Sequence, residues 1–219
     1  MKIYLVRHGE TGWNRIHKLQ GQSDIELNDV GRELAEVTAE GLKDIDFGLI
    51  YSSPLNRAYE TALILRRDRQ QEILTDKRLL EINFGEGEGG PIPRRDEVTS
   101  NPIYNFEFDM DNYIPPKGGE TFEEIFERTA EFWDEEIMPL EGKYENILIV
   151  GHGCMNRTIL NRILNRPLAE FWKIKLDNCA VSVIEVKDGR ASIEDEGRLY
   201  YSRTDERFKP LPGGPEIYG

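Results

Sequence analysis

Two stretches of the sequence share one pattern, an apolar run that ends one residue before a His-Gly pair. The first reads Ile3-Tyr-Leu-Val-Arg-His-Gly9 and the second reads Ile147-Leu-Ile-Val-Gly-His-Gly153. A short apolar run bounded by glycine is typical of a buried strand. We therefore expect His8 and His152 to follow strands directly, each with a glycine that lets a ligand or a backbone come close.

Further apolar runs alternate with stretches that have helical periodicity. Extended segments are expected at 47–51, 72–75 and 78–82, and a hairpin at 180–186 and 191–196 around Asp188-Gly189. Helices are expected over 28–42, from Ser53-Pro54 to 65, from the capping box Thr121-Phe-Glu-Glu124 to 137, and over 154–164. This alternation predicts an α/β fold, a three-layer sandwich in which helices cover both faces of a mostly parallel central sheet.

The length of 219 residues fits a single domain over 1–219. Within it, residues 84–120 are rich in glycine and proline, and we expect an irregular insertion that serves as a lid. Residues 203–219 form a second Gly/Pro-rich segment, which we expect to be a loosely ordered tail.

Composition excludes several classes of partner. Lys and Arg number 28 and Asp and Glu number 41, so the net charge is −13 and the pI is about 4.8. Such a chain lacks the broad basic surface of a nucleic-acid binder and does not suit an anionic membrane. The two cysteines, Cys154 and Cys179, do not make a disulfide scaffold. With no membrane-length apolar run and no signal-peptide pattern, we expect a cytoplasmic protein.

Charged side chains gather at the expected strand ends. Arg7 and His8 follow the first strand, Arg57 lies one turn into the helix after the second, and Glu81 ends the Leu79-Leu80 run. His152 follows the strand at 147–150. Ligands of parallel α/β sheets bind beyond the carboxyl ends of the strands. These five residues therefore predict a compact cationic pocket for a small anion.

Each of these residues also has a structural interpretation. A histidine after a strand can serve packing alone, Arg57 can pair with a surface acid, and Glu81 can be one of many solvated acids. His17 lies in a polar loop and is interpreted as a structural or rim residue. A metal site on His8 and His152 is disfavoured, because no His-x-x-His or Asp-x-His cluster supports it and two arginines would repel a cation.

Four blocks of sequence together resemble the histidine phosphatase superfamily, also called the phosphoglycerate mutase-like family, over roughly residues 1–200. The first block is Leu5-Val-Arg-His-Gly-Glu-Thr11, continued by Asn14, Gln20-Gly21 and Leu27-Asn-Asp-Val-Gly31. The others are Tyr51-Ser-Ser-Pro-Leu-Asn-Arg57-Ala, Leu80-Glu81-Ile-Asn-Phe-Gly85 and Val150-Gly-His152-Gly. A lone Arg-His-Gly would be a weak signal, but the four blocks in this order are specific.

The resemblance implies a phosphohistidine mechanism without metal or cofactor. It implies that His8 attacks phosphorus, that Arg7, Arg57 and His152 hold the phosphoryl oxygens, and that Glu81 acts as general acid and base. It also implies that Asn14, Gln20, Gly21 and Gly153 bind the substrate, a small phosphorylated metabolite. We further expect the positive end of the helix at Ser53-Pro54 to point at this anion. The oligomeric state is left open, with a homodimer as one option.

The same core would serve a phosphatase or a cofactor-dependent phosphoglycerate mutase. The insertion lacks the Arg-Arg-Ser-Tyr stretch typical of the mutases and offers few cations, Arg94, Arg95 and Lys117. This departure favours the phosphatase branch. The aromatic residues of the insertion would either contact the leaving group or pin the lid to the body; they are Tyr104, Phe106, Phe108 and Tyr113. A non-catalytic phospho-ligand binding module is the alternative from another class.

Overall fold

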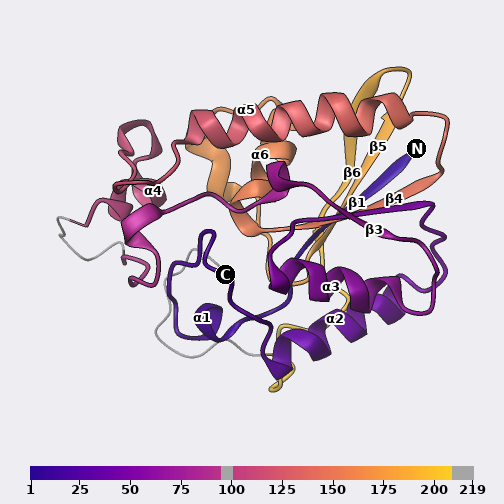
Figure 1. The fold of residues 1–219 in the computed structure, drawn as a ribbon, viewed down its shortest axis with the longest axis horizontal. Coiled ribbons are helices and arrows are strands. Elements are labelled where there is room, and N and C mark those ends of the chain that lie inside the picture. The colour runs from indigo at the N-terminus through magenta and orange to yellow at the C-terminus, as the bar shows by residue number, and fades with distance from the viewer. Residues whose placement is uncertain (95–100, 209–219) are drawn as a thin grey trace.

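A computed structural model of the protein describes residues 1–94 and 101–208. Its centre is a six-stranded sheet with the order β3-β2-β4-β1-β5-β6 (Figure 1). The strands are β1 (Lys2–Arg7), β2 (Leu49–Ser52), β3 (Ile73–Thr75), β4 (Asn146–Gly151), β5 (Val181–Lys187) and β6 (Arg190–Arg198). The first four are mutually parallel, whereas β5 runs antiparallel to β1 and to β6. The expected mostly parallel sheet with one hairpin is confirmed.

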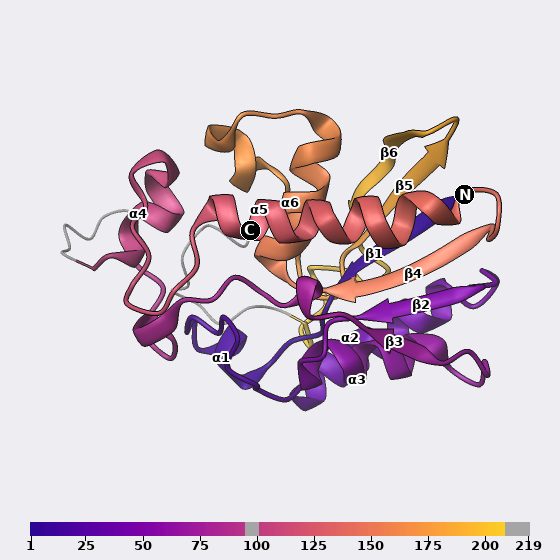
Figure 2. The ribbon, with the colours of Figure 1, turned by 45° about the horizontal axis from the view of Figure 1, so that its top comes forward.

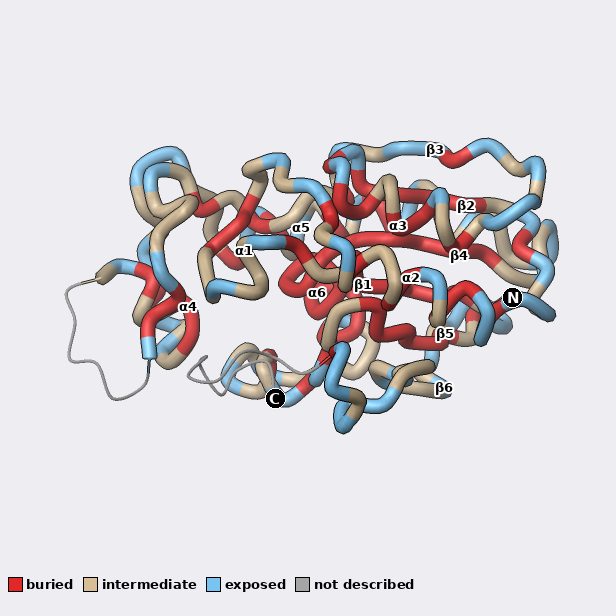
Figure 3. The backbone as a smooth tube through the Cα atoms, turned by 90° about the horizontal axis from the view of Figure 1, so that it is seen from below, coloured by how far each residue is buried: buried red, intermediate tan, exposed pale blue. Residues whose placement is uncertain are grey.

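Helices cover both faces of the sheet (Figure 2). Helices α2 (Asp29–Gly41) and α3 (Asn56–Arg66) lie on one face, and α5 (Phe122–Phe132) and α6 (Gly153–Leu164) lie on the other. Successive strand residues alternate between the two layers, as the pleat requires. Leu5 and Ile149 pack in the cluster that includes α5 and α6, while Val6 and Leu148 pack in the one that includes α2 and α3. Figure 3 shows β1 and β4 buried along most of their length. The predicted three-layer α/β architecture is confirmed.

Shorter elements gather beyond the carboxyl ends of the parallel strands. Figure 2 shows the arrowheads of β2 and β4 pointing toward the side where α1 (Gly12–Arg15) and α4 (Ile103–Phe108) lie. Short 3-10 helices lie at Lys77–Leu79, Gly85–Gly87, Met110–Asn112, Met138–Leu140 and Leu168–Lys173, and α5 continues as a π turn over Trp133–Ile137. No helix among the described residues is long and apolar enough to cross a membrane.

The expected start of α3 at Ser53-Pro54 is wrong. The helix begins at Asn56, and its N-cap residue Leu55 makes no side-chain cap bond. The carboxylate of Asp24 accepts from the Asn56 backbone N–H at 2.7 Å and from its side chain at 2.8 Å. The first backbone N–H of α3 is therefore bonded to a carboxylate of the chain itself, and the expected orientation of the helix toward a bound anion stays a prediction.

Three other expectations need correction. Residues 78–82 do not form a strand, because Asp76 accepts from the Arg78 backbone N–H and Lys77–Leu79 form a 3-10 turn. The insertion at 84–120 is not wholly irregular, since it contains α4, and residues 95–100 lie outside the described chain. The start of the tail is packed, because Phe208 is buried with its ring 5.4 Å from that of Tyr201. Residues 209–219 lie outside the described residues.

Candidate active site

The two strand–His–Gly stretches meet because their strands are neighbours. In the parallel pair of β1 and β4, Arg7 lies opposite Gly151. The backbone N–H of His8 donates to the Gly151 carbonyl at 2.9 Å, which extends the ladder by one residue. The rings of His8 and His152 then stand 5.2 Å apart, centroid to centroid. The sheet edge predicted from the sequence therefore places both histidines together.

One ring nitrogen of His8 is occupied by a backbone carbonyl, and the other keeps its lone pair. Its Nδ1 lies 2.7 Å from the Gly9 carbonyl oxygen, and because a carbonyl can only accept, Nδ1 carries the hydrogen. Burial, with the positive charges of Arg57 and Arg7, holds the pKa of His8 well below its usual range. The ring is thus neutral at physiological pH, with the lone pair on Nε2.

Backbone carbonyls hold the two arginines of this site. Arg57 is fully buried and donates from its two terminal nitrogens to the carbonyls of Ser23, at 2.8 Å, and Gly21, at 2.7 Å. Arg7 donates to the Leu176 carbonyl at 2.6 Å. Burial lowers the pKa of Arg57 to about 10, so its guanidinium stays charged at neutral pH. Carbonyl partners fix the position of each guanidinium without cancelling its charge.

Glu81 is fixed by backbone amides at the start of α6. Its Oε1 accepts from the N–H of Met155 at 2.9 Å and of Ile82 at 3.0 Å, and its Oε2 accepts from the N–H of Cys154 at 3.0 Å. From α5, Arg128 donates to the backbone carbonyls of Leu80, at 2.7 Å, and Glu81, at 3.1 Å. The carboxylate is therefore oriented by the helix that follows His152.

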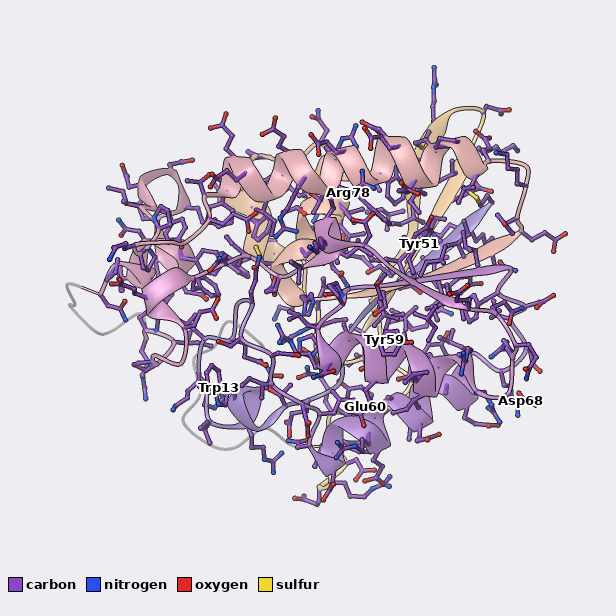
Figure 4. All side chains as sticks on the ribbon, viewed as in Figure 1. Trp13, Tyr51, Tyr59, Glu60, Asp68 and Arg78 are labelled. Atoms are coloured by element: carbon purple, nitrogen blue, oxygen red, sulfur yellow. The ribbon has the colours of Figure 1, made fainter. Side chains whose placement is uncertain are left out.

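Arg78 ties the same segment to the π turn that continues α5. It pairs with Glu135 at 2.7 Å and with Glu136 at 3.0 Å, and Figure 4 shows Arg78 just beneath that helix. No sequence pattern predicted that α5 would position the Glu81 segment, because neither Arg128 nor Arg78 lies in a recognisable motif.

The ring of His152 is buried next to that of His8. Its Nε2 is 2.8 Å from the Ser53 hydroxyl, and its Nδ1 is buried without a hydrogen-bond partner among the described residues. Burial, together with the charge of Arg57, lowers the pKa of His152 well below its usual range. Ser53, which the sequence suggested as a helix cap, serves instead to hold this ring.

A cavity opens beyond these strand ends, and eight of the nine predicted site residues line it. They are Arg7, His8, Asn14, Gln20, Gly21, Arg57, Glu81 and Gly153. His152 is not among the lining residues. Gly21 has φ +53°, and a Cβ on Gly153 would lie 3.4 Å from a terminal nitrogen of Arg157. Gly153 therefore leaves room beside the guanidinium groups, whereas a Cβ on Gly21 would meet the carboxylate of Glu88.

Sequence reasoning missed part of the cavity wall. Lys18, Phe84, Arg157 and Trp172 also line it, with Phe106 from α4. Lys18 lies 5.6 Å from the ring centroid of Trp13, on α1 (Figure 4). Lys18 sits between two quoted motif residues, Asn14 and Gln20, and its charge could have been noticed there. No comparable pattern marks Arg157 or Trp172.

The cavity is locally basic in an acidic protein. Its described lining carries four cationic side chains, Arg7, Lys18, Arg57 and Arg157, against one carboxylate, Glu81. This arrangement suits a small anion with several oxygen acceptors, such as a phosphoryl group. The described part of the chain holds no group of three or more His, Cys, Asp or Glu residues that could bind a metal ion.

Of the four aromatic residues singled out in the insertion, Tyr104, Phe106, Phe108 and Tyr113, only Phe106 lines the cavity. Its carbonyl accepts from the Trp172 indole N–H at 3.2 Å, and its ring stacks on Phe122 at 5.1 Å. Tyr113 is buried against the same two phenylalanines. The insertion is therefore pinned to the body by Phe106 and Tyr113, and Phe106 also reaches the cavity.

Comparison with known proteins gives consistent matches along most of the chain. Residues 3–197 match the family described as "Histidine phosphatase superfamily (branch 1)". The chain is 34% identical over 190 residues to Phosphoglycerate mutase-like protein 4 of Arabidopsis thaliana, covering 86% of this chain and 80% of that protein.

Two solved structures share the fold. Bacillus stearothermophilus YhfR superposes with a TM-score of 0.81 at 33% identity, covering 90% of this chain and 97% of its own. A phosphoserine phosphatase variant from Entamoeba histolytica, in complex with phosphoserine, superposes with a TM-score of 0.77 at 27% identity. That match covers 90% of this chain and 96% of the other.

Proposed function

Because the chain belongs to the histidine phosphatase superfamily, branch 1, we propose that it is a metal-independent phosphomonoesterase acting on small phosphorylated metabolites. The reaction would pass through a phosphohistidine on His8, with Glu81 as general acid and base. The observation that carries this proposal is the hydrogen bond from His8 Nδ1 to the Gly9 carbonyl. It leaves Nε2 as a nucleophile in a cavity that Arg7, Arg57 and Glu81 also line.

In the first half-reaction, the Nε2 lone pair of His8 forms a bond to phosphorus while the bond from phosphorus to the alcohol oxygen breaks. Protonated Glu81 gives its proton to that oxygen, and the alcohol leaves. In the second half, Glu81 takes a proton from water, the water oxygen bonds to phosphorus, and the P–N bond breaks. Inorganic phosphate is released, and His8 is again neutral.

The other residues would stabilise the transferred group. Phosphoryl transfer depends on positioning and on charge neutralisation more than on covalent chemistry. The guanidinium groups of Arg7 and Arg57 match phosphoryl oxygens. Asn14 and Gln20 line the cavity with side-chain amides, and we assign them as further donors. His152 would approach the group with Nδ1, the ring nitrogen that Ser53 leaves unoccupied.

The arrangement of the insertion supports hydrolysis rather than a mutase reaction. Among its described residues only Phe84 and Phe106 line the cavity. Lys117 pairs instead with Glu86 at 3.1 Å on the surface. A mutase must hold a second anionic group and exclude water, and the described lid contributes no cation to that task. Equilibration of 3- and 2-phosphoglycerate primed by 2,3-bisphosphoglycerate, with negligible hydrolysis of p-nitrophenyl phosphate, would establish the mutase instead.

Replacement of the nucleophile tests the proposal directly. The His8→Ala variant should lose turnover of all phosphomonoesters while remaining folded, and the wild type should yield an acid-labile, base-stable phosphoryl adduct. His17→Asn is the matched control, because His17 lies outside the cavity and asparagine tolerates its left-handed φ of 54°. Turnover that survives in His8→Ala would reject the nucleophile. A wild type that binds phosphate but turns over no ester would instead be a binding module.

Substrate identity and metal independence need separate measurements. Comparison of kcat/KM over many phosphomonoesters would define the substrate class, with phosphoserine and phosphoglycerates included because the names of relatives contain them. Full activity in EDTA supports a metal-free reaction, and loss of activity that added divalent cations restore would reject it.

A further inference from the structure

We propose that Asn178 is a positioning residue for phosphomonoester hydrolysis, because its side chain fixes the Asn14 amide and the main chain of His8. This inference rests on the proposed function. Asn178 lies just before β5, and its Nδ2 donates to the His8 carbonyl at 3.0 Å and to Asn14 Oδ1 at 3.4 Å. One amide thus contacts both the residue that carries the nucleophile and a neighbour that lines the cavity.

The orientation of the Asn14 amide decides what it offers a ligand. The backbone N–H of Thr11 points at Asn14 Oδ1 across 3.1 Å, and a backbone N–H can only donate. The carbonyl end of the Asn14 amide therefore faces Thr11 and Asn178, and its NH2 end is left for the cavity. Phosphoryl oxygens accept hydrogen bonds, so this is the useful orientation. The flipped amide would present a carbonyl oxygen to an anion.

Asn178 is in turn held by the chain that follows the hairpin. The Tyr201 hydroxyl donates to the Asn178 carbonyl at 2.8 Å. Burial raises the pKa of Tyr201 far above its ordinary value, so the hydroxyl keeps its proton and remains a donor. Next to Asn178, Asp177 pairs with Arg203 at 2.7 Å. The Cys179 backbone N–H donates to the Arg7 carbonyl at 3.0 Å.

These contacts make the segment after β6 part of the active-site framework. Tyr201 and Phe208 are more than twenty residues from Asn178 in sequence, yet Tyr201 bonds to it and Phe208 packs on Tyr201. If Asn178 had a purely structural role, its substitution would lower the stability of the protein and leave phosphate binding unchanged. A positioning role predicts that Asn178 and Asn14 act on phosphate as one unit.

A double-mutant cycle tests this role. The variants are Asn178→Asp, Asn14→Ala and the two combined, each measured for kcat/KM on p-nitrophenyl phosphate and for the dissociation constant of inorganic phosphate. The Asn178→Asp change keeps the side-chain shape but replaces a donor by an acceptor that repels both the Asn14 and the His8 oxygens. Asn146→Asp is the matched control. Asn146 donates to the Asp46 carbonyl at 3.1 Å, at the opposite end of β4.

Each single variant should weaken phosphate binding and lower kcat/KM by about 10- to 100-fold, the range expected for one hydrogen bond to a charged group. The double variant should be no more than a few-fold worse than the poorer single variant, because residues in one network are not additive. Asn146→Asp should leave both quantities unchanged. Multiplicative losses in the double variant, or a folded Asn178→Asp with wild-type phosphate affinity, would overturn the proposal.

A milder variant covers the case in which Asn178→Asp fails to fold. Tyr201→Phe removes only the donor to the Asn178 carbonyl, and we expect a few-fold loss of kcat/KM that disappears in an Asn14→Ala background. An equal loss in both backgrounds would reject the coupling. Absence of turnover in the wild type would signal failure of the proposed function. Wild-type turnover with no coupling between Asn14 and Asn178 would signal failure of this inference alone.

Discussion

The backbone N–H of Cys154 donates to Oε2 of Glu81 across 3.0 Å, at the first turn of α6. The helix that begins directly after His152 thereby orients the carboxylate that we assign as the acid and base. A side chain on one segment and amides on another, 73 residues apart, form a single unit. Glu81 and His152 therefore share one structural support, the first turn of α6. Substitution of either side chain should affect the reaction more than folding.

We predict that Glu81→Gln separates the two half-reactions. Without the acid, alkyl phosphomonoesters should lose about 10²- to 10⁴-fold in kcat/KM. Nitrophenolate leaves without a proton, so the first turnover of p-nitrophenyl phosphate should remain fast, while the second half slows because water lacks its base. Rapid mixing should show a burst of nitrophenolate followed by slow turnover. Glu86→Gln, on the surface, is the control, and equal first-turnover losses for both esters would contradict the assignment.

We predict that Ser53→Ala weakens phosphate binding through His152. The change removes the hydroxyl that lies 2.8 Å from His152 Nε2 and leaves a buried ring with no hydrogen-bond partner among the described residues. The loss of stability should be about 1–3 kcal/mol, with a roughly tenfold weaker phosphate affinity because the ring loses its orientation. Ser182→Ala, which removes a buried acceptor on β5, should lose stability only. Equal phosphate affinity in both variants would contradict the assignment of His152 to phosphoryl binding.

Much of the fold and part of the site could be predicted because apolar runs mark buried strands. The runs before His8 and His152 became neighbouring parallel strands, and neighbours in a parallel sheet end at one edge. The family suggested by the motifs is confirmed by the match over residues 3–197. The roles assigned to the site residues remain predictions.

The remaining contacts carry no periodic signal. Trp172 donates to the carbonyl of Phe106, 66 residues away, and Asp24 caps α3 from 32 residues away. The pattern Ser53-Pro54 is a good helix start in isolation, but the Ser53 hydroxyl is used by His152 and a distant carboxylate supplies the cap instead. Tertiary packing decides which side chain caps the helix, and local sequence propensity carries no information about that packing.

We predict that Gly21→Ala disrupts the loop that holds Arg57. Gly21 has φ +53°, and an added Cβ would meet the carboxylate of Glu88, which also accepts from the N–H groups of Gln22 and Ser23. Gly142→Ala is the control, since Gly142 also has positive φ but has open space around its Cβ position. Both variants should lose about 1 kcal/mol from backbone strain. Only Gly21→Ala should also raise KM, and equal effects of the two on KM would contradict this role of Gly21.

We predict that Glu107 makes stability fall between pH 4.5 and pH 8. Glu107 lies on α4, is only 4% exposed, and neither of its carboxylate oxygens has a hydrogen-bond partner among the described residues. Burial raises its pKa from 4.5 to about 8, against the opposing charge of Arg157. In this window the native state holds a proton that the unfolded chain has released. Each pH unit therefore removes about 1.4 kcal/mol from the free energy of unfolding.

Urea unfolding of the wild type and of Glu107→Gln at pH 5, 7 and 8.5 measures this effect. The wild type should lose stability relative to the variant as pH rises, and the difference should level off above pH 8. Glu131→Gln, an exposed position on α5, should track the wild type. His8 and His152 are buried in the neutral form, so the free energy of unfolding also falls below about pH 6.5, where these residues are protonated in the unfolded chain. This effect is the same in all three proteins and cancels in the comparison. Parallel curves for the wild type and Glu107→Gln would mean that Glu107 is already ionised in the native state, with a cation close enough to hold its charge.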